Sequence, residues 1–545
     1  MLKQIKYLLL IVFLAAILRL MNLSSNPPAL NWDEVSHGYN AYSVLKTGSD
    51  EWGKLLPTIF QAYGDYKLPV YIYLTTLSQL LLGLTSIAVR LPSALAGITT
   101  VIFTYLLVKK LFNKEKLALL SAFLVAIEPW SLFLSRGAFE ANLSLALIIA
   151  GVYLFTTKNK LLSFLLLGLS LWTYNSARVF VPLLLASLIA IYRINSKKII
   201  LPILLFMVFF LPMVYQLFHT VGVARYGKVA ILDEGGINKI LDIRSKMNLP
   251  TPMPRLISNK ITYFSAFFVK NYFSHFSPKF LFFKGGTNYQ FNIPNRGLIY
   301  LINLPFFVLG LIYLIRNYKE KNCQLILFWL ILSPIASSLT REAPHTLRSI
   351  VMLPMPMIIT ALGFSLIKEK KWITAGYMFV LTLFLGSYLD VYFNNYRVNY
   401  SWSWQYGYRE VVSYIKENYE KYDKIIITKK YGEPHEFLLF YLKYDPSKYA
   451  NDVNLIRFNQ SDWYWVDRFD KFYFVNDWEV PKTGNDFVLE SGSTVHCSPA
   501  SPSQGGPSTD HCLLITSPDN SPSGWLNIYR INFLDGKPAF EMYAN

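Results

Sequence analysis

The sequence predicts an α-helical polytopic membrane protein with about eleven transmembrane helices, juxtamembrane helices and a C-terminal extracytoplasmic α/β domain. Hydrophobic residues make up 53% of the 545 residues and charged residues only 16%, well below the roughly 25% of soluble globular proteins. The mean hydropathy is +0.30. Long apolar runs recur as far as residue 391 and then stop. We therefore predict a transmembrane domain over 1–391 and a small α/β domain over 392–545.

The apolar runs predict the transmembrane helices one by one. A membrane-spanning helix needs about 20 mainly apolar residues. The predicted spans are 7–23, 89–108, 117–134, 140–157, 161–177, 178–192, 199–217, 297–315, 323–340, 348–367 and 372–391. A further run, 68–87, contains Pro69, Thr75 and Gln79, which favours an amphipathic helix lying in the interface. No small-residue cleavage site follows the first run, so we expect a retained helix and no cleaved signal peptide.

The charge distribution predicts the orientation in the membrane. The net charge of +18 divides into +22 over 1–391 and −4 over 392–545. If 68–87 does not span, all clusters of basic residues between the runs fall on one side, which the positive-inside rule makes cytoplasmic. We therefore predict a multi-pass plasma-membrane protein with a cytoplasmic N-terminus. Nucleic acid is not expected as a partner, because no basic face on a folded module is visible.

The tail alternates helical and strand patterns. Apolar periodicity predicts helices over 409–419 and 436–444 and strands over 424–428, 453–458, 471–475, 512–516 and 527–533. Cys497 and Cys512 flank a low-complexity loop at 498–510, and an oxidising compartment favours a disulfide between them. A histidine precedes each cysteine, which leaves a metal site as the alternative.

Two long outside loops are predicted, at about 24–88 and 218–296. The second contains the aromatic stretch 262–283, which indicates a belt at the membrane interface, a groove for a lipid tail, or both. Lys284 follows this stretch and Arg296 ends the loop. Both residues could approach or gate a lipid carrier.

The first outside loop also carries the clearest candidates for chemistry, Asp33 and Glu34. Side chains of adjacent residues point different ways, so one could act as a base while the other holds structure; a solvated turn is the alternative. Lys67 opens the interfacial helix, where it could extend to the headgroups or bind a lipid phosphate.

The short outside turns add a second group of charges. Each carries an arginine at the membrane boundary, and the residues concerned are Arg136 with Glu140, Tyr174 with Arg178, and His345 with Arg348. Charges at helix ends that face a helix bundle are functional candidates. Their convergence on one side indicates an anionic substrate resident in the membrane, such as a lipid phosphate.

The order of these features resembles the polytopic C-type glycosyltransferase superfamily, which includes protein O-mannosyltransferases and lipid A aminoarabinose transferases. The resemblance covers about residues 1–390 and rests on NWDE (31–34), KLP (67–69), the span that begins RLPSALAG at residue 90, SRGAFE (135–140), SPKFLFFKGG (277–286) and PHTLRS (344–349). The HPP form typical of eukaryotic protein mannosyltransferases is not present, which argues against protein as the acceptor.

The resemblance implies transfer of a sugar from a polyprenyl-phosphate carrier to an acceptor outside the membrane, with a membrane lipid environment. By resemblance, Asp33 would be the general base of an inverting displacement, and Glu34 would orient the acceptor or the nearby backbone. The donor phosphate would contact Lys67, Arg136 and Arg348, and the sugar or acceptor pocket would be formed by Glu140, Tyr174, Arg178 and His345. No cofactor is expected, and a divalent ion at Asp33, Glu34 and Glu140 is not favoured.

Three other functions fit parts of the sequence. A transporter or flippase for lipid-linked sugars usually has paired repeats and broken helices at the midplane, whereas here the charges gather at the outer ends of the spans. An oligosaccharide ligase would need a large acceptor cleft, which the second outside loop could provide. A receptor would leave the arginines at the membrane boundary unexplained.

Overall fold

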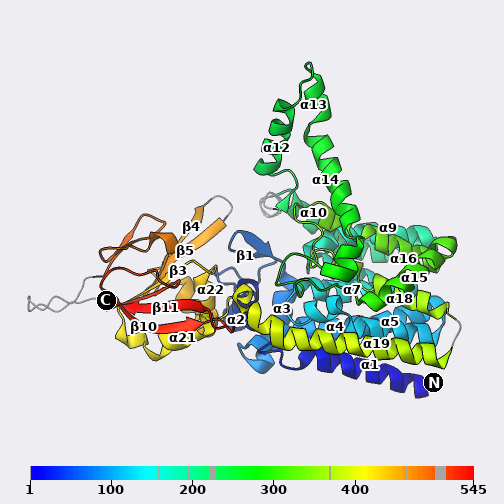
Figure 1. The fold of residues 1–545 in the computed structure, drawn as a ribbon, viewed down its shortest axis with the longest axis horizontal. Helices are drawn as coiled ribbons and strands as arrows, with labels where there is room; N and C mark the ends of the chain where they lie inside the picture. The colour runs from blue at the N-terminus through cyan, green and yellow to red at the C-terminus, as the bar shows by residue number, and fades with distance from the viewer. Residues whose placement is uncertain are drawn as a thin grey trace, which may run out of the picture. The chain divides into compact units, whose positions relative to one another are not determined.

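The computed structural model describes residues 2–157, 159–193, 196–219, 229–367, 370–460, 463–497 and 511–545 (Figure 1). The chain forms two compact units. The helical unit comprises Met1–Met21 and Pro92–Asp390, and the mixed unit comprises Asn22–Leu91 and Val391–Asn545. The first outside loop therefore groups with the C-terminal segment, whereas the sequence analysis drew one boundary after residue 391. A functional boundary at that position stays a prediction.

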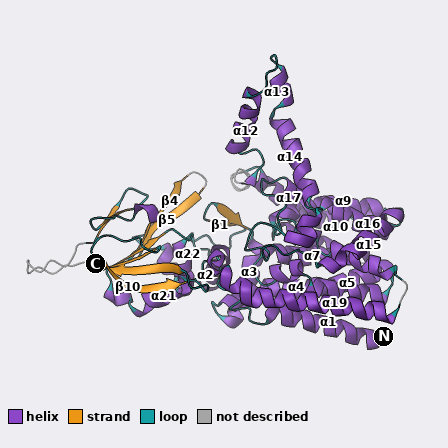
Figure 2. Cartoon of the chain, viewed as in Figure 1, coloured by secondary structure: helices purple, strands orange, loops and turns teal. Residues whose placement is uncertain are grey.

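The helical unit is built almost entirely from α-helices (Figure 2). They are α1 (Leu2–Leu20), α4 (Ser86–Phe112, which begins in the mixed unit), α5 (Glu115–Ile127), α6 (Pro129–Leu134), α7 (Glu140–Thr156), α8 (Lys160–Leu171), α9 (Asn175–Tyr192), α10 (Ile200–Leu217), α12 (Glu234–Ser245), α13 (Met253–Ile257), α14 (Lys260–Ser274), α15 (Leu304–Arg316), α16 (Lys321–Leu332), α17 (Ile335–Ser338), α18 (Met355–Ser365) and α19 (Lys371–Asp390). A π-helical segment, η2 (Lys279–Lys284), follows α14.

Four helices among the described residues are long and apolar enough to cross a membrane: Ser86–Phe112, Asn175–Tyr192, Ile200–Leu217 and Lys371–Asn399. Five apolar helices are shorter, at 10–17 residues. The predicted number of eleven spans is therefore not confirmed. Prolines account for part of the difference, because a proline inside a helix removes a backbone donor and clashes with the preceding turn. Pro129 separates α5 from α6, Pro334 separates α16 from α17, and Pro354 precedes α18.

The break at Pro129 leaves Glu128 buried in the helical unit. Its carboxylate accepts a hydrogen bond from the backbone N–H of Tyr300 at 2.9 Å and another from the Asn303 amide. The Tyr377 hydroxyl donates to the Asn303 side-chain oxygen at 2.7 Å. A buried carboxylate is tolerated when it is hydrogen-bonded in this way, so these contacts give Glu128 a structural role at the helix break.

The mixed unit combines the first outside loop with the tail. The loop contains α2 (Trp32–Thr47), the hairpin β1–β2 (Phe60–Ala62 and Asp65–Lys67) and α3 (Pro69–Leu82). The tail contains η5 (Val391–Tyr396), α20 (Arg397–Asn399), α21 (Tyr408–Glu417), α22 (Pro434–Tyr441), α23 (Pro446–Ala450), β3 (Lys424–Thr428), β4 (Ile456–Gln460), β5 (Trp463–Phe469), β6 (Phe472–Val475), β7 (Asp486–Val488), β8 (Thr494–His496), β9 (Cys512–Thr516), β10 (Leu526–Asn532) and β11 (Pro538–Ala544). The interfacial placement of 68–87, where α3 lies, stays a prediction.

Seven strands of the tail form one sheet in the order β10-β11-β9-β3-β6-β5-β4. The central strand β3 pairs parallel with both β6 and β9, and the outer pairs are antiparallel. Central parallel strands are buried on both faces and are therefore continuously apolar, as KIIIT and CLLIT are. The tail is thus a small α/β domain.

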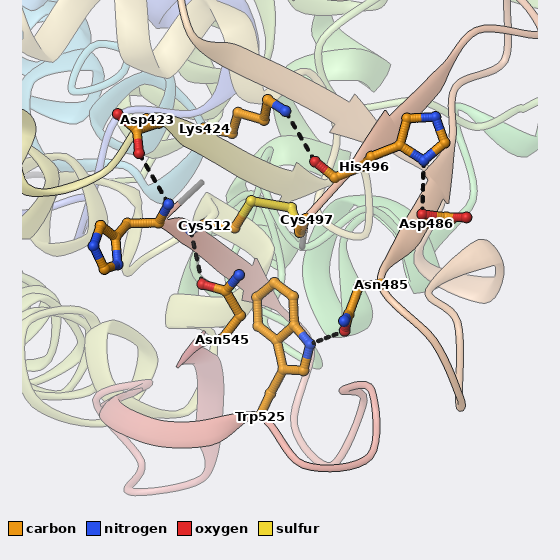
Figure 3. The surroundings of a disulfide bond; sticks show 10 residues. Asp423, Lys424, Asn485, Asp486, His496, Cys497, Cys512, Trp525 and Asn545 are labelled. Atoms are coloured by element: carbon orange, nitrogen blue, oxygen red, sulfur yellow. Dashed lines mark hydrogen bonds and ion pairs between the residues drawn. A yellow bond between two sulfur atoms is a disulfide. The ribbon is translucent and has the colours of Figure 1, made fainter. Parts of the chain in front are cut away.

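A disulfide joins Cys497, just after β8, to Cys512, the first residue of β9 (Figure 3). This is the pair that the sequence analysis expected to be linked. Both sulfur atoms are committed to the bond, and the His496 ring contacts Asp486 at 2.8 Å (Figure 3). These contacts favour the disulfide over the metal alternative. The low-complexity loop at 498–510 lies outside the described residues.

Candidate active site

The start of α2 separates the two adjacent acids. The Asn31 side chain accepts a hydrogen bond from the Glu34 N–H at 2.9 Å, and the Asn31 N–H donates to the Glu34 carboxylate at 3.1 Å. This reciprocal arrangement is a capping box, and it directs Glu34 into the protein. Asp33 points the other way and keeps 51% of its side chain exposed. The acids therefore have different surroundings, as expected for neighbours on a chain.

Glu34 is bound on both oxygens by Arg90, the fifth residue of α4. Arg90 Nε lies 2.8 Å from one carboxylate oxygen and Nη2 lies 2.9 Å from the other. Arg90 Nη1 also donates to the backbone oxygens of Leu23 and Pro27, at 3.0 and 2.9 Å. Both side chains are buried. This bidentate pair ties α2 to the segment before it, so Glu34 orients the backbone around Asp33.

Asp33 is paired with Lys67. The Lys67 ammonium forms an ion pair with Asp33 Oδ1, and the Tyr63 hydroxyl donates to the same oxygen at 2.9 Å. The β1–β2 hairpin brings Lys67 there, with Phe60 opposite Lys67 and Gly64 at a φ of +64° in the turn. Lys67 is only 7% exposed and lies 5.5 Å from the centre of the Tyr63 ring.

The charge on Lys67 sets the ionisation of Asp33. The surroundings of Asp33 would raise its pKa through desolvation, but the Lys67 charge and the hydrogen bonds outweigh this effect and lower the pKa to about 2. Desolvation is the largest single influence on this pKa, and it is exceeded only by the charge of Lys67 and the hydrogen bonds from Lys67 and Tyr63 acting together. Asp33 is therefore a carboxylate at neutral pH.

His37 lies one turn after Asp33 on α2 and is buried. Its ring packs edge-on against Tyr71 at 5.3 Å. Burial and the Lys67 charge lower the pKa of His37 to about 3, so the ring is neutral at physiological pH. A neutral imidazole can accept or donate a hydrogen bond close to the Asp33–Lys67 pair without adding a charge.

In the helical unit, Arg136 contacts the end of α1. Its guanidinium donates to the backbone oxygens of Leu18 and Met21 at 2.6 and 2.7 Å, and the residue is 1% exposed. Arg19 makes similar contacts to the backbone oxygens of Val125 and Ala126. Cations suit the C-terminal ends of helices because the last carbonyls carry a partial negative charge. These contacts account for Arg136 structurally, and a role in phosphate binding stays a prediction.

The helical unit brings together two of the other predicted turns. The Ser176 hydroxyl, between Tyr174 and Arg178 in the first turn of α9, donates to the backbone oxygen of Arg348 at 2.8 Å. The Arg348 guanidinium contacts Thr340 at 3.0 Å and Glu342 at 3.4 Å. The Arg348 N–H donates to His345 Nδ1 at 3.2 Å.

Within this cluster, burial lowers the pKa of His345 to about 3, which favours a neutral, structural histidine. Arg178 donates to the Leu171 backbone oxygen at 3.2 Å. Glu140 begins α7.

Lys284 and Arg296 lie at the two ends of one loop. A Cβ on Gly285 would be 2.7 Å from the Arg296 backbone oxygen, and both charged side chains are exposed. The structure therefore places the two predicted gating residues near each other. Among the described residues, no group of three or more histidine, cysteine, aspartate or glutamate side chains could hold a metal ion.

Comparison with known proteins supports the resemblance seen in the sequence. Residues 67–216 match the family model for dolichyl-phosphate-mannose-protein mannosyltransferases, beginning at Lys67. The structure of ArnT from Cupriavidus metallidurans in the apo state aligns with a TM-score of 0.54 at 10% identity, over 99% of this chain and 98% of that chain. The resemblance to C-type glycosyltransferases is confirmed. At this identity the likeness to ArnT establishes the fold.

A second solved structure is also similar. The archaeal oligosaccharyltransferase AglB from Archaeoglobus fulgidus, in complex with an inhibitory peptide and a dolichol-phosphate, aligns with a TM-score of 0.49 at 12% identity. The alignment covers 80% of this chain but only 63% of AglB. No curated protein is significantly similar to the chain.

Three site residues were missed by the sequence analysis: Arg90, Tyr63 and His37. Arg90 opens a predicted span and looked like a boundary charge. Tyr63 and His37 carried no signal beyond their position in the first outside loop, although an i, i+4 spacing from Asp33 puts His37 on the same side of a helix.

Proposed function

We propose that the chain is a membrane glycosyltransferase that moves a sugar from a polyprenyl-phosphate carrier to an acceptor outside the membrane. The observation that carries this proposal is the Asp33–Lys67 pair, in which a half-exposed carboxylate lies against a nearly buried ammonium. The family-model match beginning at Lys67 and the ArnT-like fold support it.

Asp33 is the proposed general base. Its carboxylate accepts the proton of an acceptor hydroxyl while that oxygen bonds to the anomeric carbon of the sugar. The bond from the anomeric carbon to the phosphate oxygen breaks on the opposite side, so the configuration inverts. Polyprenyl phosphate leaves with one more negative charge. Positioned bases contribute typically 10²–10⁴-fold to the rate.

Lys67 is the proposed partner of the leaving phosphate. It is the cation closest to the base, and a charge that grows during the reaction is best stabilised by a cation already in place. Phosphate binding would draw the ammonium away from Asp33. The pKa of Asp33 would then rise, because the Lys67 charge that lowers it would be shared with the phosphate. Asp33 would become a stronger base.

The remaining residues take supporting roles in this proposal. Arg348 is retained as a second phosphate ligand, and Tyr174, Arg178, Glu140 and His345 as pocket residues. We propose that Arg136 acts mainly by capping α1, since its guanidinium already contacts two backbone oxygens. We also propose that the reaction needs no metal and that the C-terminal domain faces the outside.

A donor-cleavage assay tests this function. Purified protein in detergent is incubated with labelled polyprenyl-phosphate hexoses and a membrane or cell-wall extract, and label leaving the carrier is measured. Wild type should release label, and D33N should lose about 10²–10⁴-fold in rate. The matched control is D50N, a buried aspartate in the same loop. Equal label release by wild type and D33N, with matched thermal unfolding, would exclude Asp33 as the base.

The same assay separates transfer from transport. A transporter moves the intact lipid-linked sugar, so the bond between sugar and phosphate survives. Wild-type protein that leaves every tested donor intact, while moving it across a vesicle membrane, would favour the transporter.

A further inference from the structure

The second outside loop forms a helical hairpin that extends away from the helix bundle. The hairpin runs from α12 through α13 to α14, and α13 lies at its far end (Figure 1). Figure 1 also shows that α14 runs across the direction of α1 and α19. Because α19 is long and apolar enough to cross a membrane, a helix that runs across it follows the surface of the bilayer.

Contacts at the base of the hairpin hold it against the bundle. Arg341 forms an ion pair with Asp233, the residue before α12, and the Arg341 N–H donates to the Val229 backbone oxygen at 2.8 Å. Near the end of α14, the Asn271 amide donates to the Thr340 backbone oxygen at 2.9 Å. Both arms of the hairpin thus contact residues 340–341, which fixes where the hairpin leaves the bundle.

The tip of the hairpin, residues 249–261, exposes a cluster of apolar side chains. Five of them are between 47% and 78% exposed: Leu249, Met253, Leu256, Ile257 and Ile261. On α14 the exposed apolar surface continues at Val269 and Phe273, which lie on the same side of the helix as Ile261. Single apolar residues on a surface need no explanation, but a contiguous exposed patch marks an interaction site.

The same part of the chain is strongly basic. Residues 243–296 contain eight lysine or arginine residues and no aspartate or glutamate. Arg255 and Lys260 lie within the tip, and both side chains are exposed. Long loops can cross a membrane whatever their charge, so the topology does not explain this excess of cations. Basic segments beside a bilayer are attracted to anionic headgroups.

We propose that the tip of the hairpin docks on the anionic phospholipids of the bilayer. Its apolar side chains would enter the region between headgroups and acyl chains, and Arg255 and Lys260 would lie beside the lipid phosphates. Apolar residues edged with cations are typical of segments that bind in the membrane interface. The proposal does not depend on the chemistry at Asp33, so it can hold even if the proposed function fails.

A spin label measures how deeply the tip enters the lipid. L256C is made in full-length protein with C323S, since Cys323 is the free cysteine and the other two form a disulfide. The labelled protein is reconstituted into vesicles of phosphatidylcholine alone or of an equimolar mixture with phosphatidylglycerol. Power saturation then gives the collision rates of the label with oxygen, which concentrates in lipid, and with a water-soluble nickel chelate. V453C, at a position that is 93% exposed in the tail, is the reference for a label in water.

In the mixed vesicles, the label at L256C should collide more often with oxygen than with nickel. Its nickel collision rate should be about fivefold lower than in phosphatidylcholine alone, because each cation near an anionic surface favours binding by about that factor. The label at V453C should collide mainly with nickel in both kinds of vesicle.

A charge variant separates electrostatic attraction from apolar contact. With R255Q and K260Q added to L256C, the nickel collision rate should lose most of its dependence on phosphatidylglycerol. The matched control carries K416Q and K448Q, which neutralise two exposed lysines of the tail. This control should keep the full difference between the two kinds of vesicle.

Three results would overturn the proposal. Equal nickel collision rates at L256C in both kinds of vesicle would show that anionic lipid does not hold the tip. A label shielded from both oxygen and nickel would show that protein covers it. A response to added polyprenyl phosphate but not to phosphatidylglycerol would make the tip a site for the carrier. If L256C does not fold, I261C repeats the measurement at the most exposed of the five apolar side chains.

Discussion

At the scale of single residues, one capping arrangement divides the work between two adjacent acids. Asn31 fixes the first turn of α2, and this turn commits Glu34 to Arg90 while it leaves Asp33 half exposed. Removing one partner of a buried ion pair leaves an uncompensated charge, which costs about 3–5 kcal/mol. Glu34 is therefore held in place, and Asp33 can exchange one partner for another.

The role of Lys67 predicts a specific kinetic change. K67M should raise the donor KM about tenfold or more, because a hydrogen bond to a charged group contributes about 1.5–3 kcal/mol. Steady-state kinetics with a polyprenyl-phosphate sugar measures this. The matched control is K54M, an exposed lysine in the same loop, which should behave as wild type. An unchanged KM in K67M would remove Lys67 from the phosphate site.

The structure brings together two of the residues that the sequence of the first outside loop singled out, Asp33 and Lys67, while their roles in the chemistry stay predictions. The acidic pair and Lys67 stand out because they lie in an outside loop next to apolar runs. Arg90 and Arg136 look alike in the sequence, since each lies near the end of a predicted membrane span. Only the fold shows that Arg90 binds Glu34 and that Arg136 binds the end of α1, because these partners are distant in the chain.

At the scale of elements, small residues allow two helices of the helical unit to touch. A Cβ on Gly310 of α15 would lie 1.9 Å from the Ile359 backbone oxygen, and one on Gly363 of α18 would lie 1.8 Å from the Phe306 backbone oxygen. Close backbone approach at glycines is a common way to pack helices in membranes. The α15–α18 contact is therefore intolerant of larger side chains.

This packing predicts that G363A destabilises the protein. The added methyl group would meet backbone, which cannot move aside as a side chain can, so we expect a loss of about 1–3 kcal/mol and a lower Tm in detergent. G376A in α19, where no atom lies within 4 Å of the new Cβ, should leave the Tm unchanged or raise it. Equal Tm values for the two variants would show that α15 and α18 are not in close contact.

Element prediction was best for strongly patterned segments. The strands KIIIT and CLLIT were predicted with the observed bounds, because buried parallel strands are uninterrupted apolar runs. β5 and β11 were missed, since WYWVDRF and PAFEMYA mix apolar with charged residues. The predicted spans 117–134, 323–340 and 348–367 are interrupted in the structure, because hydropathy does not register that Pro129, Pro334 and Pro354 interrupt the helical hydrogen bonds.

At the scale of the whole molecule, the mixed unit is built from two segments that flank residues 92–390 in the sequence. Residues 22–91 and 391–545 pack together although about 300 residues separate them. Composition could not reveal this, because the first loop and the tail differ in their helix and strand patterns. The contact between α2 and α22 packs the tail against the helix that carries Asp33.

The predicted orientation can be tested in intact cells. V453C, at a position that is 93% exposed in the tail, should react with a membrane-impermeant maleimide from outside. K319C, in a predicted cytoplasmic loop with an exposed side chain, should react only after permeabilisation. The physical reason is the excess of lysine and arginine between the spans. The reverse pattern of labelling would invert the topology.

The pH dependence of wild-type turnover and of K67M tests the central claim most directly, namely that Lys67 moves from Asp33 to the donor phosphate. A base acts when deprotonated, so activity falls as the pH drops through its pKa. The acid limb of the kcat/KM profile reports the free enzyme, in which the pKa of Asp33 is lowered to about 2. The acid limb of the kcat profile reports the complex with the donor. We predict that in wild type the limb of kcat lies at a higher pH than that of kcat/KM, and that in K67M the two limbs coincide. Coincident limbs in wild type would contradict the exchange of Lys67 between Asp33 and phosphate.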